Sequence, residues 1–169
     1  MIVAIFGRSC SGKTALASAV ASLLKFSVRH CGDAIREAAS AADVSIDELS
    51  IEQHQKVDQA TYQWASASGV ALVEGRFLQY VLSSFERPLL LVEVTCSASV
   101  REVRWGDRMG QPVDAQSLAE MDESEDRLVQ SLYSSIMPRI AELAIDTTTL
   151  SVDECAQQVV AAVVRLGGA

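Results

Sequence analysis

The sequence predicts an α/β fold in which helices cover both faces of a parallel β-sheet. Short apolar segments of strand length alternate along the chain with longer amphipathic segments, and this alternation is typical of parallel strands joined by crossover helices. The segments 2–6, 70–74 and 88–95 are apolar at nearly consecutive positions, as expected of strands that are buried on both faces.

The N-terminal elements are placed by local signals. The apolar strand 2–6 runs directly into a glycine, and a helical pattern follows over 13–25. Residues 26–30 fit a second short strand, and a helix follows over about 32–42. Two strands and two helices are therefore expected in this part of the chain.

Two capping boxes mark the helices of the middle segment. In 45–48 and in 50–53, a serine is followed three residues later by Glu or Gln, so each serine is expected to begin a helical turn. The second helix continues to about residue 68, and Gly69 ends it before the strand 70–74.

The C-terminal half continues the alternation. After the strand 88–95, a helix from about residue 98 leads into a polar loop. A long helix is expected over 114–137, a weak strand over 143–146 and a final helix over 151–166. The expected loop contains Gly106, Gly110 and Pro112.

Length and charge limit the classes of function. A chain of 169 residues is long enough for one domain, 1–169, and too short to expect two. The formal net charge is −8, which argues against DNA or RNA as a bulk partner, because no broad basic face offsets the phosphate charge. A small anionic ligand is compatible with this charge, since a pocket needs only a few well-placed cations.

The sequence favours a cytoplasmic protein that does not enter a membrane. The four cysteines, Cys10, Cys31, Cys96 and Cys155, show no metal-like pairing, and we expect reduced thiols. No basic flank precedes the apolar start of the chain, so no signal peptide is indicated. The longest apolar runs are far shorter than the roughly 20 residues that span a bilayer.

The strongest motif is a phosphate-binding loop, or P-loop, at residues 7–14. The segment reads Gly-Arg-Ser-Cys-Ser-Gly-Lys-Thr and matches G-x-x-x-x-G-K-[ST] at every fixed position. It follows a buried strand and precedes a helix, so backbone N–H groups and the helix dipole meet at the bound phosphate. The predicted ATP phosphate-binding residues are Gly7, Arg8, Ser9, Cys10, Ser11, Gly12, Lys13 and Thr14.

Two side chains of the loop have distinct expected roles. Lys13 should reach the β- and γ-phosphates as a catalytic group, and Thr14 should place its hydroxyl on Mg²⁺. We therefore expect ATP, or GTP in its place, together with Mg²⁺. Cys10, at the crest of the loop, is interpreted as a tolerated small residue.

Other segments narrow the class of P-loop protein. The base-reading Asn/Thr-Lys-x-Asp segment of GTPases and the signature of ABC-type ATPases are both absent from the sequence. Arg36 lies in the helix after the second strand, and Arg76 follows the third strand. Arg104 and Arg108 are four residues apart and therefore share a helix face. Because guanidinium groups suit phosphate oxygens, this pattern favours a kinase.

The same segments resemble those of nucleoside monophosphate kinases, and most closely the short, archaeal-like cytidylate kinases. The likeness extends over nearly the whole chain. It includes the P-loop, Gly-Asp-x-x-Arg, Leu-Val-Glu-Gly-Arg, Arg-x-x-x-Arg, Glu-Ser-Glu with a downstream tyrosine, and Ile-Asp-Thr-Thr-Thr before a serine-capped helix. In the same order, the P-loop is at 7–14, Gly-Asp-x-x-Arg at 32–36, Leu-Val-Glu-Gly-Arg at 72–76 and Arg-x-x-x-Arg at 104–108. Glu-Ser-Glu is at 123–125 with Tyr133 downstream, and Ile-Asp-Thr-Thr-Thr is at 145–149.

The resemblance implies a three-layer P-loop kinase fold with a five-stranded sheet in the order 2-3-1-4-5. It also implies transfer of the γ-phosphoryl group of ATP to a small acceptor, most simply a nucleoside monophosphate such as CMP. Acceptor-binding helices would lie within about 32–68 and a lid within about 104–116. In that family, lid arginines close over the transferring phosphoryl group, so Arg104 and Arg108 are expected to be catalytic.

Further residues are expected around the acceptor. Asp33 either contacts the acceptor or caps its helix, and Glu74 either orients the water shell of Mg²⁺ or pairs with an arginine. Asp58 is a candidate for reading an exocyclic amine. His30 and His54 have no partner pattern and are interpreted as non-catalytic. The predicted acceptor-binding residues are Asp33, Arg36, Asp58, Glu74, Gly75 and Arg76, with the two arginines on the acceptor phosphate.

Two segments depart from the cytidylate kinase pattern. The cytidylate kinase pattern has an arginine-rich stretch at residues 121–129, but the only arginine there in this chain is Arg127. The arginine that usually accompanies Asp58 in that pattern is also missing. Three functions therefore stay open: a nucleoside monophosphate kinase, a kinase for a modified nucleotide or small metabolite, and a nucleotide-binding regulator with little turnover. The complete P-loop favours an enzyme, because a regulator that never transfers phosphate has less need of it.

Overall fold

The computed structural model of the chain describes residues 1–167 and contains a five-stranded, parallel sheet. Its spatial order is β2-β3-β1-β4-β5, which confirms the order 2-3-1-4-5 implied by the resemblance to nucleoside monophosphate kinases. The central strand β1 is buried at all five positions. The strands are β1 (Ile2–Phe6), β2 (Ser27–His30), β3 (Ala71–Gly75), β4 (Leu89–Thr95) and β5 (Leu143–Asp146).

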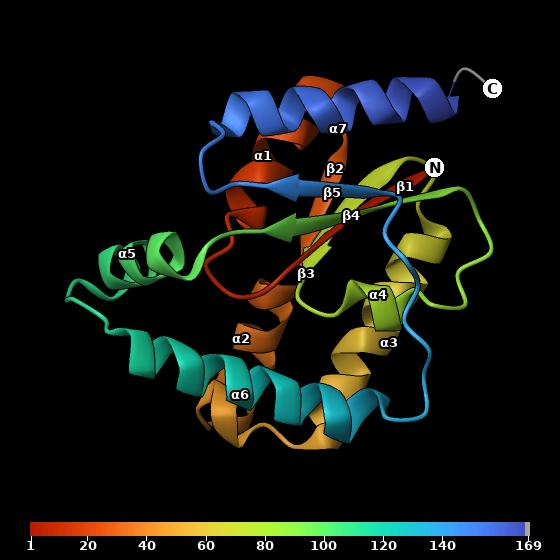
Figure 1. The fold of residues 1–169 in the computed structure, drawn as a ribbon. Helices are drawn as coiled ribbons and strands as arrows, with labels where there is room; N and C mark the ends of the chain where they lie inside the picture. Colours follow the sequence, from red (N-terminus) through yellow and green to blue (C-terminus); the bar gives the residue numbers. More distant parts are fainter. Residues whose placement is uncertain (168–169) are drawn as a thin grey trace.

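Helices cover both faces of this sheet and so form three layers (Figure 1). The helices are α1 (Lys13–Leu24), α2 (Cys31–Ala42), α3 (Ile51–Ala67), α4 (Leu78–Val81), α5 (Ala98–Met109), α6 (Ala115–Tyr133) and α7 (Val152–Gly167), with a 3₁₀ turn (Ile46–Glu48) before α3. α1 and α7 pack side by side on one face, and α3 and α4 cover the other. None of the helices in residues 1–167 combines the length and hydropathy needed to traverse a lipid bilayer.

Two apolar clusters fill the spaces between the layers. Neighbouring residues of a strand point to opposite faces, so Val3 packs with Val20 of α1 and Val159 of α7, whereas Ile2 packs with Ala65 of α3. All five of these side chains are fully buried. Burying each of the larger ones contributes roughly 1.5–3 kcal/mol, which explains the continuous apolar runs in the sequence.

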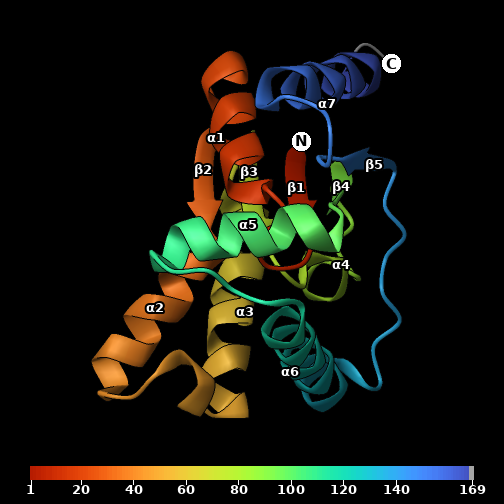
Figure 2. The ribbon, with the colours of Figure 1, turned by 60° about the vertical axis from the view of Figure 1, so that its left-hand side comes forward.

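The carboxyl ends of the strands converge at one edge of the sheet, where α5 and α6 lie (Figures 1 and 2). Ligands of open parallel sheets bind at this edge. The P-loop after β1, the start of α2 after β2 and the segment after β3 all lie there, so the chain brings most of its predicted site residues to one region.

The elements differ from the sequence-based expectation at three places. Helix α4 is not signalled by the sequence, because four residues are too few to show a helical period. Gly106 lies inside α5 rather than in the following loop, and the helix ends at Gly110, which has a left-handed backbone with φ of 70°. α6 ends at Tyr133, about one turn before residue 137, ahead of Pro138, which cannot continue a helix.

Candidate active site

The loop between β1 and α1 requires both fixed glycines of its motif. Gly12 has a left-handed backbone with φ of 93°, which glycine adopts without steric strain. A Cβ atom on Gly7 would lie 2.2 Å from the carbonyl oxygen of Val94, so no larger residue fits between β1 and β4. The loop thus passes close to β4 and enters α1 with the free N–H groups of the first helical turn beside it.

Lys13 is buried beneath this loop. It is 8% exposed, and its ammonium donates a hydrogen bond to the carbonyl oxygen of Arg8 over 3.0 Å. Burial lowers the pKa of Lys13, and the nearby carboxylates of Glu74 and Glu125 oppose that shift. An ammonium has three N–H donors, so Lys13 can bind phosphate oxygens without moving away from the loop.

Thr14 occupies the first turn of α1 and lines the same cavity as Lys13. Residues 1–167 contain no group of three or more His, Cys, Asp or Glu side chains arranged to hold a metal ion. In kinases, Mg²⁺ is held mainly by the phosphates of the nucleotide, with one or two protein oxygens. The Thr14 hydroxyl beside a glycine-lined loop therefore fits a magnesium ion that arrives with its nucleotide.

Carboxylates of α6 hold the crest of the P-loop. Arg8 donates to Asp126 over 2.8 Å, and the hydroxyl of Ser9 donates to Glu125, which is 5% exposed. Both acidic residues lie in the stretch 121–129, where the cytidylate kinase pattern has arginines. In this chain, that stretch therefore binds the loop itself through acidic side chains.

Arg101 of α5 binds both the P-loop and α6. Its guanidinium forms a bidentate pair with Asp122 of α6, at 2.6 and 2.9 Å, and its Nε donates to the carbonyl oxygen of Ser9 over 2.9 Å. Hydrogen bonding to this guanidinium lowers the pKa of Asp122. Arg101 is buried and belongs to the scaffold of the loop, a role that its sequence neighbourhood does not indicate.

A cavity of about 610 Å³ lies beside the P-loop, within the volume range of small-molecule sites. Lys13 and Thr14 line one side of it, and Arg108 of α5 also reaches it, whereas Arg104 does not line it. The structure brings every residue predicted to bind the acceptor to its wall: Asp33, Arg36, Asp58, Glu74, Gly75 and Arg76.

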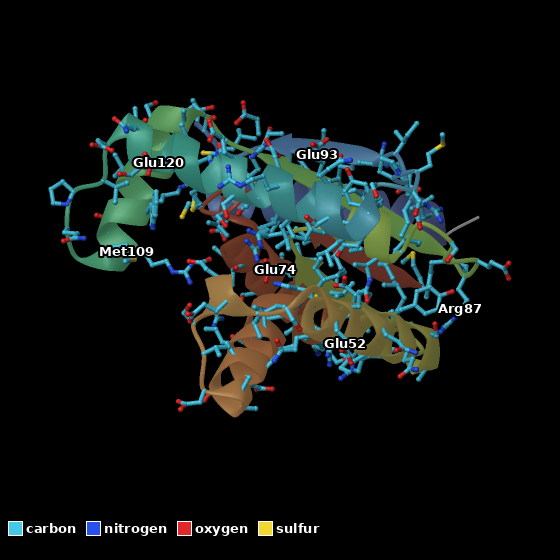
Figure 3. The ribbon with its side chains drawn as sticks, turned by 90° about the horizontal axis from the view of Figure 1, so that it is seen from below. Glu52, Glu74, Arg87, Glu93, Met109 and Glu120 are labelled. Carbon is cyan, nitrogen blue, oxygen red and sulfur yellow. The ribbon has the colours of Figure 1, made fainter. Side chains whose placement is uncertain are left out.

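Glu74, at the end of β3, pairs with a histidine rather than an arginine. In the parallel register of the sheet, His30 of β2 lies opposite Glu74, and its Nδ1 is 3.1 Å from the Glu74 Oε2. Glu74 is 4% exposed and lies in the interior, between α2 and α3 on one side and α5 and α6 on the other (Figure 3). The two residues are far apart in sequence, so no local pattern reveals the pair.

The two arginines predicted to bind the acceptor phosphate are each paired with a carboxylate. The Arg76 Nη1 lies 3.4 Å from the Glu125 Oε1, and its guanidinium lies over the Phe77 ring, 5.1 Å from the ring centroid. Arg36 pairs with Asp33, three residues earlier on α2, and both side chains are about half exposed. Asp33 thus has an ion-pair partner on its own helix and provides no side-chain cap.

Asp58 of α3 is held by a tyrosine from α6. The hydroxyl of Tyr133 donates to the Asp58 Oδ2 over 2.5 Å, and the Tyr133 ring stacks on Tyr80 with centroids 4.8 Å apart. Burial raises the pKa of Asp58 to about 6, although the Tyr133 hydroxyl opposes the shift. The carboxylate therefore lies at the cavity wall with one oxygen bound to Tyr133.

The two arginines expected in the lid have different surroundings. The Arg104 guanidinium donates to the side-chain and carbonyl oxygens of Thr147, each over 2.9 Å, and a Cβ atom on Gly12 would lie 3.1 Å from it. Arg108, one turn later, is exposed and faces the cavity. Arg104 is thus fixed against the P-loop and the loop after β5, whereas Arg108 lines the cavity.

Comparisons with known proteins identify kinases as relatives of this chain. No protein-family model matches the chain. Its sequence is 28% identical over 165 residues to a cytidylate kinase of Pyrobaculum calidifontis, covering 91% of this chain and 88% of that protein. It is 24% identical over 166 residues to a cytidylate kinase of Thermoplasma volcanium, covering 92% of this chain and 87% of that protein.

Solved structures share the fold at lower sequence identity. A gluconokinase from Sinorhizobium meliloti superposes with a TM-score of 0.68 and 18% identity, covering 97% of this chain and 91% of that one. A shikimate kinase from Acinetobacter baumannii superposes with a TM-score of 0.65 and 14% identity, covering 97% and 93%. Sequence and fold together support a phosphotransferase that acts on a small molecule.

Proposed function

We infer that this chain, which has the P-loop kinase fold and is cytidylate kinase-like in sequence, transfers the γ-phosphoryl group of ATP to a nucleoside monophosphate, with CMP or a close relative as the best acceptor. The observation that carries this inference is that one cavity is lined by Lys13 and Thr14 and also by Arg76 and Asp58. Donor and acceptor groups would then meet at the carboxyl edge of the sheet.

The chain's own residues supply positioning and charge. Phosphoryl transfer requires an in-line arrangement of donor and acceptor and cations around the charge of the transition state, with little covalent help. Lys13 and the N–H groups of the loop would bind the donor phosphates, and Thr14 would hold Mg²⁺. Bound Mg²⁺ supplies positive charge to the β- and γ-phosphate oxygens.

The acceptor half of the cavity offers contacts to both ends of a nucleotide. Guanidinium forks bind phosphate oxygens in a bidentate manner, and Arg36 and Arg76 would hold the acceptor phosphate. Glu74, Gly75 and Asp33 shape the wall beside it. At the other end, the Asp58 carboxylate would accept a hydrogen bond from the 4-amino group of cytosine.

A coupled ADP-release assay with ATP, Mg²⁺ and a panel of nucleoside monophosphates tests the proposal. We expect CMP to exceed UMP by well over tenfold in kcat/KM, because uracil offers no amino group to the Asp58 oxygen that Tyr133 does not bind. If AMP or GMP were the favoured acceptor, the chain would resemble cytidylate kinases in fold but not in acceptor. A chain that binds ATP but phosphorylates no common monophosphate would contradict the proposed acceptor class.

Replacing Asp58 with asparagine should reduce this discrimination and stabilise the fold at alkaline pH. The raised pKa of about 6 means that the ionised form is disfavoured in the folded state, so the contribution of Asp58 to stability falls as pH rises from about 4 through 6. Relative to wild type, Asp58→Asn should therefore gain roughly 2 kcal/mol of unfolding free energy between pH 4 and pH 8. Urea unfolding at the two pH values measures the gain, and equal differences at both would contradict it.

Arg76→Ala should raise the KM for the acceptor at least tenfold and leave the KM for ATP nearly unchanged, because its contact is to the acceptor phosphate. The matched control is Arg127→Ala, which removes an exposed arginine of α6 that pairs with Glu123 at 3.7 Å and should have little effect. Steady-state kinetics with each substrate varied in turn distinguish the variants. Equal changes in both KM values would mean that Arg76 is structural.

A further inference from the structure

His30 lines the cavity and pairs with a buried carboxylate. Its Nδ1 lies 3.1 Å from a carboxylate oxygen of Glu74, and an ionised carboxylate only accepts hydrogen bonds, so Nδ1 carries the hydrogen and donates it. In the neutral ring, Nε2 then keeps a lone pair. A carboxylate that fixes a histidine in this tautomer is the arrangement that orients histidine bases in enzymes.

His30 also shares its cavity with the P-loop. It ends β2 at the carboxyl edge of the sheet and lines the same cavity as Lys13 and Thr14 of the P-loop. A nucleophile bound in this cavity would share it with the γ-phosphoryl group held by Lys13 and Thr14. The charged or titratable groups that line the cavity together with His30 are Lys13, Cys31, Asp33, Arg36, His54, Asp58, Glu74, Arg76, Arg108 and Tyr133.

The charges of the cavity fit a neutral acceptor as well as an anionic one. Arg76 is paired with the buried Glu125, and Arg36 is paired with Asp33, so both arginines already have anionic partners within the chain. Asp33 and Asp58 add carboxylate oxygens to the wall. Hydroxyl groups donate hydrogen bonds to carboxylates and bring no charge that needs compensation.

We propose that His30 is the general base for a second activity, the phosphorylation of a hydroxyl group on a neutral, hydroxyl-rich small molecule. His30 takes the hydroxyl proton on Nε2 while the hydroxyl oxygen forms a bond to the γ-phosphorus of ATP. The bond from that phosphorus to the β–γ bridging oxygen breaks, its electron pair stays on that oxygen, and ADP is released. The inference rests on the phosphoryl transfer proposed above, but it does not depend on CMP as the acceptor.

The two acceptor classes should depend on His30 to different extents. A phosphate monoester has a second pKa of about 6, so at pH 8 its attacking oxygen is already ionised and needs no base. A hydroxyl group stays protonated at that pH and gains from proton transfer in the transition state. General-base catalysis contributes about 10²-fold or more, and this factor should appear only with the hydroxyl acceptor.

The test compares wild type with His30→Gln at pH 8, with ATP and Mg²⁺. The probes are CMP and three neutral hydroxyl compounds: cytidine, D-ribose and glycerol. ADP release is measured, and mass spectrometry identifies the phosphorylated product. We expect wild type to phosphorylate at least one hydroxyl probe, and His30→Gln to lower that kcat/KM about 10²-fold while changing the value for CMP only a few-fold.

A second variant separates chemistry from structure. In His30→Ala, added imidazole should restore part of the hydroxyl phosphorylation, because a free base can enter the space left by the ring. His54 is the other histidine of the chain and is also buried at the cavity, so His54→Ala is the matched control. Imidazole should not restore any activity that this control loses.

Three results would overturn the inference. The first is phosphorylation of CMP with no phosphorylated product from any hydroxyl probe. The second is an equal loss of kcat/KM for both acceptor classes in His30→Gln, which would mean that His30 has a structural role. The third is the absence of turnover by wild type with either acceptor class. A phosphorylated hydroxyl probe with CMP inert would support His30 as the base and contradict the monophosphate acceptor proposed above.

Discussion

Lys13→Met should abolish phosphoryl transfer while the chain still folds. The ammonium of Lys13 is buried under the P-loop, beside the amides that would bind the β- and γ-phosphates. Methionine has a similar length and is apolar, so the variant removes the charge without opening a large cavity. We expect kcat/KM to fall at least about 10³-fold, since loss of one preorganised charged group in phosphoryl transfer has effects of this size.

Stability should change little in this variant. Burial already disfavours the charged form of Lys13, and Glu74 keeps His30 as a partner. Thermal unfolding checks the fold, and the matched control is Lys56→Met, which removes an exposed lysine of α3 that pairs with Glu52 at 2.8 Å. Turnover of Lys13→Met within a few-fold of wild type would remove Lys13 from the mechanism.

The fold was predictable because its signals are local. Continuous apolar runs specify buried parallel strands, and the capping boxes at Ser45 and Ser50 are both present in the structure. The strand order followed from a resemblance, since strand pairing is not visible in a single sequence. The early end of α6 at Tyr133 was missed because the apolar residues that follow continue a helical pattern, while Pro138 ends it.

Within the candidate site, detailed local geometry could be predicted only where one segment contains all of its parts. The P-loop is such a segment, and its glycines meet the steric constraints that the motif predicts. Pairs that join distant segments, such as His30 with Glu74, Ser9 with Glu125 or Tyr133 with Asp58, arise from sheet register and helix packing.

Individual residues in these pairs did give a signal. Glu125 and Tyr133 both fall in segments that carry the cytidylate kinase resemblance, although the resemblance does not say what they contact. Asp122 and Asp126, in the same stretch, have no such match, and their roles in binding Arg101 and Arg8 become visible only in three dimensions. The histidine His30 gave no signal, because a single histidine at a strand end has no recognisable pattern without its partner.

Arg108→Ala is expected to lower kcat by roughly 10²- to 10³-fold and to leave the ground-state affinities for ATP and acceptor nearly unchanged. Arg108 is exposed in the last turn of α5, faces the cavity and is close enough to the P-loop to oppose the rise that burial causes in the pKa of Cys10. In the part of the chain that the structure describes, Arg108 forms no ion pair, so its guanidinium is available when charge develops on the transferring group.

Arg104 provides the matched comparison, because it is on the same helix, one turn earlier, with the same charge. Its guanidinium is held by Thr147 at 2.9 Å and lies against Gly12 of the P-loop. Arg104→Ala should therefore weaken ATP binding, whereas an arginine that meets the phosphoryl group mainly in the closed state changes kcat. Calorimetry with a non-hydrolysable ATP analogue measures the affinity of each variant, and steady-state assays measure its kcat. Together they distinguish a loss of ATP binding from a loss of catalysis. If Arg108→Ala raised only KM, the residue would act in substrate binding, and the catalytic assignment to α5 would then depend on Arg104 alone.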